Sequence, residues 1–156
     1  MEKRSVLILK AEITWWLLTA TIVFGVLYPI SSSLDNYPFF QVNVIFIIVF
    51  ITLTRYVFLL KHSFFAHFNF LKIILGIVSV PLIFYLIEHI IDFQIFLDEV
   101  GLESFMKYKS LSWRTSMASY IRSEMLLFGV ASVIIAIIFP FRMMLSVWRQ
   151  YNKGTV

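Results

Sequence analysis

Four apolar runs, each long enough to cross a lipid bilayer as a helix, dominate the chain. They cover residues 13–34, 39–60, 70–91 and 125–148. A hydrocarbon core of about 30 Å needs about 20 helical residues. Transmembrane strands alternate between apolar and polar positions over about 10 residues, whereas these runs are apolar on every side. The pattern therefore predicts an all-α integral membrane protein, a bundle of four transmembrane helices in a single domain over 1–156.

Composition supports the same class and excludes several others. Hydrophobic residues make up 60% of the chain and charged residues only 14%, against about 25% charged in soluble domains. The absence of cysteine excludes disulfides and thiolate chemistry. None of the motifs G-x-S-x-G, H-E-x-x-H or a glycine-rich phosphate loop occurs. We expect no cofactor and no bound metal, and the absence of these motifs leaves an enzymatic activity unsupported.

The basic residues predict an orientation. The positive-inside rule places clusters of lysine and arginine on the cytoplasmic side, and three groups flank the apolar runs on one side. The groups are Lys3, Arg4 and Lys10; Lys61 and Lys72; and Arg142, Arg149 and Lys153. Both termini should then be cytoplasmic, in the inner membrane of a bacterium. This distribution also accounts for the net charge of +4 without a nucleic-acid partner.

The stretch 84–94 carries three titratable groups, Glu88, His89 and Asp92, in an otherwise apolar context. Glu88 follows Leu71 by seventeen residues, about 26 Å along a helix, which places the trio near the outer membrane surface. The main interpretation is that they mark the interface. The alternatives are a contact with lipid or a partner, or a proton or ion site, because Glu88 and Asp92 are i,i+4 neighbours.

Other polar residues lie within or beside the runs. Arg55 is expected to snorkel toward the surface or to form an ion pair with Glu12, which would fix the register of two helices. Gln41 and Asn43 are expected to mark the interface or to form hydrogen bonds between helices. His62 and His67 are five residues apart, a spacing that does not place both on one helical face, so we do not interpret them as metal ligands.

The connection over about 92–124 is predicted to be an extracytoplasmic amphipathic loop. Within it Trp113, Met117, Tyr120 and Ile121 follow a helical period. That face should cover a membrane surface, another protein or the chain's own helices. Beyond Pro140 the tail should lie along the inner interface, with lipid or partner contacts at Arg142, Trp148 and Arg149.

Three functions follow as expectations, in descending order. The first is a non-catalytic accessory or scaffold subunit of a larger membrane complex, with other integral membrane proteins and lipids as partners. Small residues in the first and last runs would permit close helix contacts; they are Ala20, Thr21, Gly25, Gly129, Ala131, Ser132 and Ala136. The second is a small ion-coupled transporter or proton-conducting subunit that uses Glu88, His89 and Asp92. The third is a lipid-modifying membrane enzyme.

Overall fold

The computed structural model describes residues 2–34, 37–60, 63, 68–106 and 109–152. Its elements in chain order are α1 (Glu2–Ser31), α2 (Phe40–Leu59), α3 (Asn69–Glu99), the 3-10 helix η3 (Leu102–Met106) and α4 (Leu111–Tyr151). Each of the four α-helices contains a segment long and apolar enough to cross a membrane. The prediction of an all-helical chain with four such helices is confirmed.

The segment predicted as a loop over 92–124 requires a correction, because most of it is helical. Helix α3 continues to Glu99 and α4 already begins at Leu111. The break between them is short and depends on Gly101, whose φ of 71° favours glycine. The amide of Gly101 donates to the carbonyl of Phe96, as in a helix C-cap. Helix α3 continues to Glu99 because Phe93, Phe96 and Leu97 extend its apolar face and pack in the core.

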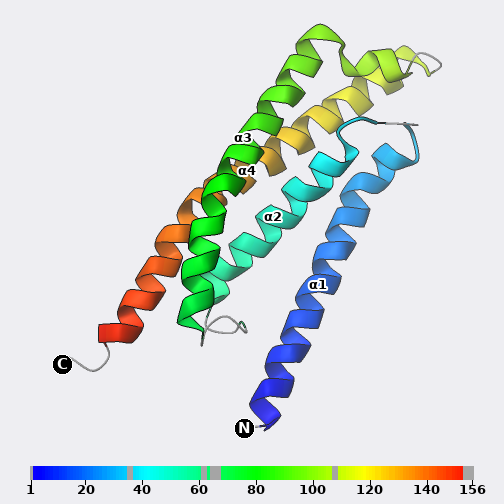
Figure 1. The fold of residues 1–156 in the computed structure, drawn as a ribbon. Coiled ribbons are helices and arrows are strands. Elements are labelled where there is room, and N and C mark those ends of the chain that lie inside the picture. The colour runs from blue at the N-terminus through cyan, green and yellow to red at the C-terminus, as the bar shows by residue number, and fades with distance from the viewer. Residues whose placement is uncertain (1, 35–36, 61–62, 64–67, 107–108, 153–156) are drawn as a thin grey trace.

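The tail after Pro140 is likewise part of a continuous helix. Helix α4 passes through Pro140 and ends only at Tyr151, and α3 passes through Pro81. Neither proline ends its helix, in keeping with the tolerance for proline where neighbouring groups satisfy the freed backbone. The N-terminal end of α1 and the C-terminal end of α4 lie at the same end of the molecule, opposite η3 (Figure 1). We name these two ends the terminal end and the η3 end.

Helix α4 is the central element of the packing, because it lies against both α2 and α3. Gly129 permits this close approach: a Cβ atom there would lie 3.1 Å from side-chain carbons of both Ile90 on α3 and Phe46 on α2. The small residues Ser132 and Ala136 continue the same buried stripe on α4. Small residues at such positions let membrane helices come into close contact.

Helix α1 packs mainly on α2 and diverges from the other helices toward its N-terminal end (Figure 1). In the part of the chain that the structure describes, polar contacts attach it to α2 and to α4. Near the terminal end Glu12 meets Arg55 of α2. Nearer the η3 end the hydroxyl of Tyr120 on α4 donates to the carbonyl oxygen of Val26 at 2.8 Å.

A Tyr120→Phe substitution tests the second attachment. It removes one hydrogen bond between helices, and we expect it to lower the free energy of unfolding by about 0.5–1.5 kcal/mol. Unfolding by SDS in mixed micelles, followed by circular dichroism, measures the change. Tyr28→Phe is the matched control, because the Tyr28 hydroxyl donates to no described residue. Equal stability of the two variants would contradict the assignment.

Candidate functional site

A carboxyl group and a side-chain amide meet inside the protein, between α4 and α2. Glu124 is only 6% exposed and Asn43 is fully buried. The Nδ2 group of Asn43 donates a hydrogen bond to Oε1 of Glu124. This contact is an interhelical hydrogen bond, one of the two environments expected for Asn43, and its partner Glu124 lies in the stretch predicted as a loop.

The local sequence explains why Glu124 faces inward. It follows the buried Ile121 by three residues and directly precedes the buried Met125. Residues three and four apart share one face of a helix, so Glu124 lies on the face that α4 turns toward the core. Asn43 lies one turn into α2 and three residues before the buried Phe46, so the same rule turns it inward.

This pair and Tyr37 contain buried polar atoms without partners. Three buried oxygen atoms have no hydrogen-bond partner among the described residues: Oε2 of Glu124, Oδ1 of Asn43 and the hydroxyl of Tyr37. Tyr37 lies just before α2 and is 7% exposed. Burial raises the pKa of Tyr37, and a charged Glu124 carboxylate would raise it further.

No lysine, arginine or histidine in the described ranges forms an ion pair with Glu124. The described ion pairs join Arg55 to Glu12 and His89 to Asp92. Ionisable residues inside membrane-spanning helices are costly, and they are functional candidates by default. Glu124 with Asn43 and Tyr37 is therefore the candidate functional site.

The predicted trio on α3 has a different environment. Glu88 and Asp92 are exposed, and the ring of His89 stacks on Tyr85 with centroids 4.1 Å apart. Nδ1 of His89 lies 4.0 Å from a carboxylate oxygen of Asp92. Helix α3 continues for seven residues after Asp92, so the trio does not mark the end of the helix. This geometry adds no support for a proton or ion pathway through these three residues.

Metal binding gains no support in the described part of the chain either. It contains no group of three histidine, cysteine, aspartate or glutamate residues that could hold a metal ion. His62 and His67 lie outside the described residues.

Arg55 and Glu12 lie in contact. The Nη2 and Nη1 atoms of Arg55 are 2.7 Å and 2.8 Å from the two carboxylate oxygens of Glu12, a bidentate arrangement. The guanidinium also lies over two aromatic rings, with distances of 5.6 Å to the centroid of Trp15 and 5.4 Å to that of Tyr56. Arg55 is 6% exposed. The pair joins α1 to α2 and is the kind of contact that fixes helix register.

The amphipathic face at the start of α4 packs largely on the chain's own helices. Ile121 is fully buried, and Trp113 and Met117 pack against the main core cluster. Tyr120 bonds to Val26, as described above. Of the three expected environments for this face, the geometry favours contact with the chain's own helices.

The residues predicted near the tail divide into one internal contact and two exposed side chains. Arg142 donates from Nε to the carbonyl oxygen of Val57, 2.8 Å away. Trp148 and Arg149 are exposed. Trp148 also lines an apolar groove of about 850 Å³ between α3 and α4, next to Pro81 and Pro140.

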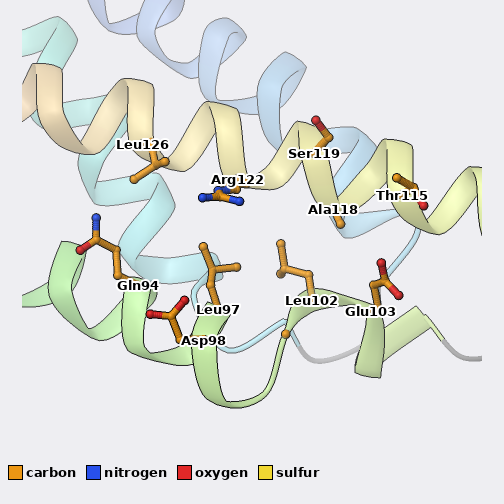
Figure 2. Close-up of a pocket in the computed structure, with 11 residues that line it drawn as sticks. Gln94, Leu97, Asp98, Leu102, Glu103, Thr115, Ala118, Ser119, Arg122 and Leu126 are labelled. Atoms are coloured by element: carbon orange, nitrogen blue, oxygen red, sulfur yellow. The ribbon is translucent and has the colours of Figure 1, made fainter.

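An open polar cleft of about 770 Å³ lies at the η3 end, between α3, η3 and α4 (Figure 2). Its lining includes Arg122 from α4, Asp98 from α3 and Glu103 from η3. Within the described residues these three charged side chains form no hydrogen bond or ion pair with one another. Arg122 can pair with a phosphate and either carboxylate with an ammonium group, so the cleft has the charges to bind a zwitterionic solute.

The fold and its buried polar pairs are typical of an integral membrane protein made of apolar helices. No protein family, no curated protein and no solved structure matches the chain.

Proposed function

We propose that this chain is a non-catalytic accessory subunit of a larger complex in the cytoplasmic membrane of a bacterium. In this proposal its four helices form a bundle with both termini in the cytoplasm. A transmembrane helix of another integral membrane protein packs on the exposed face of α1.

The observation that carries the proposal is the different use of small residues on α4 and α1. On α4, Gly129, Ser132 and Ala136 are buried in contacts with the chain's own helices. On α1, Thr21 and Gly25 are exposed, and a Cβ atom at Gly25 would meet nothing within 4 Å. Small residues four apart allow a second helix to approach closely. The small residues of α4 are thus buried in contacts within the chain, whereas those of α1 remain exposed and can contact another helix.

The one polar side chain of the exposed notch at Thr21 and Gly25 is satisfied within α1. The hydroxyl of Thr21 donates to the carbonyl of Leu17 at 2.9 Å. The rings of Phe24 and Tyr28 lie beside the notch with centroids 5.4 Å apart, and both are exposed. Such a surface fits an apolar helix that has its own backbone hydrogen bonds satisfied, which is what a partner's transmembrane segment offers.

Charge favours a different protein over a second copy as the occupant. Two copies in one membrane share the same orientation, so a symmetric contact through α1 would bring identical residues to the same depth. The exposed Lys10 of each copy would then face the other. Like charges repel, so a partner helix with a neutral or acidic end at this depth is the better fit.

A Gly25→Leu substitution tests the proposal. The added side chain meets open space within the chain, so the variant should fold and reach the membrane as the wild type does. It should fill the notch and lower the yield of a stoichiometric partner, recovered in mild detergent and counted by mass spectrometry, by at least about tenfold, which corresponds to about 1.4 kcal/mol of binding energy.

Val130→Leu serves as the matched control, because it adds bulk at an exposed position on α4. It should retain the partner. A photo-crosslinker at Thr21 should label the same partner, while one at the exposed Val78 of α3 should label only lipid. The proposal fails if the wild type is monodisperse and alone, if it purifies only as a homo-oligomer, or if Gly25→Leu keeps the partner.

A further inference from the structure

The buried site at Glu124 contains more acceptors than donors when its carboxyl is charged. A carboxylate only accepts hydrogen bonds, and an amide oxygen does the same. The amide of Asn43 already donates to Oε1 of Glu124. Oε2 of Glu124 and Oδ1 of Asn43 then accept no hydrogen bond from the described groups. The Tyr37 hydroxyl is also without a partner, and its single proton could serve only one of these two atoms. Each buried polar atom left in this state costs about 1–3 kcal/mol.

One proton added to the Glu124 carboxylate gives both of these atoms a hydrogen-bond partner. The two polar atoms of a carboxyl group and the two of a side-chain amide have closely similar spacing, so one hydrogen bond aligns the second pair of atoms. A proton on Oε2 of Glu124 becomes a donor, and Oδ1 of Asn43, on the side chain that already bonds to this carboxyl, is an acceptor without a partner. The result is a reciprocal pair with two hydrogen bonds.

We propose that Glu124 is a buried proton-binding site, in which the protonated carboxyl and the Asn43 side chain form this reciprocal pair. The binding step adds one proton from water to the carboxylate and makes or breaks no other covalent bond. The ligand is a proton rather than a metal ion, because the part of the chain described holds no cluster of three acidic, histidine or cysteine ligands, and metal sites need several convergent ligands.

Among the residues that the structure describes, the elements packed around Glu124 supply no cation that forms an ion pair with it and would hold it as a carboxylate. Helix α2 contributes Asn43, and the connection before α2 contributes Tyr37, whose raised pKa keeps the phenol neutral. On α4 the Tyr120 hydroxyl is directed to the α1 backbone at Val26. On α3 the residue that contacts α4 beside Gly129 is the apolar Ile90, and His89 is directed to Tyr85 and Asp92.

Infrared difference spectroscopy of the full chain in lipid vesicles at neutral pH tests this inference. The wild type minus Glu124→Gln difference should contain the carbonyl band of one protonated carboxyl per chain. In D₂O that band should shift to lower frequency, which shows that the proton exchanges. Glutamine can form the same two hydrogen bonds with Asn43, so this variant should fold. Asp98→Asn, at an exposed carboxyl in the cleft, is the control and should show loss of carboxylate bands only.

Asn43→Leu provides a second variant that retains Glu124. It should shift the frequency of the carboxyl band, because the hydrogen-bond partner is lost. Two results would overturn the inference. One is a wild type minus Glu124→Gln difference with carboxylate bands and no protonated carboxyl. The other is conversion of the band to carboxylate when Na⁺ replaces choline at constant pH, which would make the ligand a metal ion. Neither readout depends on the partner proposed for α1, so the two proposals can fail separately.

Discussion

A Gly129→Leu substitution is expected to lower the free energy of unfolding by about 1–3 kcal/mol, the usual cost of overpacking a well-packed interior. A Cβ atom at this position already lies 3.1 Å from both Ile90 and Phe46, and leucine adds three further carbons beyond it. Helix α4 would have to move away from α2 and α3 at once, because Gly129 lies where all three meet. Unfolding in mixed SDS micelles, followed by circular dichroism, gives the free-energy difference.

Gly25→Leu is the control for this effect. Both substitutions exchange glycine for leucine within a helix and gain the same helix propensity, up to about 1 kcal/mol. At Gly25 the new side chain meets open space, so the stability of that variant should equal or exceed that of the wild type. If the two variants unfold at the same SDS concentration, the close packing around Gly129 is not what holds α4 in place.

The architecture could be predicted from the sequence because the physics that sets it is local. A run of about 20 apolar residues must satisfy its own backbone in lipid and therefore forms a helix. The ends of the helices could not be predicted in the same way. Hydropathy reports where the apolar run stops, whereas α3 and α4 continue into polar sequence as long as one face stays packed. Phe93 and Phe96 perform that role on α3 and Trp113 and Ile121 on α4.

The candidate site was missed for a related reason. The prediction of a loop over about 92–124 includes Glu124, in a stretch that also contains lysines and arginines, and so does not mark it as buried. The signal that could have found it was present: the period of Trp113, Met117 and Ile121, carried one turn further, reaches Glu124 and Met125 on the same face. The partner, Asn43, lies 81 residues away in sequence, and which helix faces which depends on tertiary packing. No local pattern specifies such a pairing.

Arg55→Met is expected to cost about 3 kcal/mol, the low end of the about 3–5 kcal/mol that breaking a buried ion pair costs. Methionine keeps most of the apolar stem but removes the charge and the donors, so Glu12 loses two short hydrogen bonds from the guanidinium. It also removes the contacts with the rings of Trp15 and Tyr56, worth about 0.5–1 kcal/mol each. The cost lies at the low end because Glu12 is 18% exposed and gains some solvation when its partner is lost. The SDS-unfolding assay measures this difference.

A double-mutant cycle with Glu12→Gln separates the ion pair from these aromatic contacts. If the two groups interact directly, the double variant should be more stable than the sum of the single changes predicts, with a coupling energy of about 1–3 kcal/mol. The exposed Arg149, replaced by methionine, is the matched control: its own effect should stay within about 0.5 kcal/mol and should add to that of Glu12→Gln without coupling. Additivity of Arg55→Met and Glu12→Gln would mean that the aromatic rings, and not the Glu12 carboxylate, account for the burial of Arg55. The attachment of α1 near the terminal end would then depend on the cation–π contact with Trp15, and Trp15→Leu would reproduce the full loss.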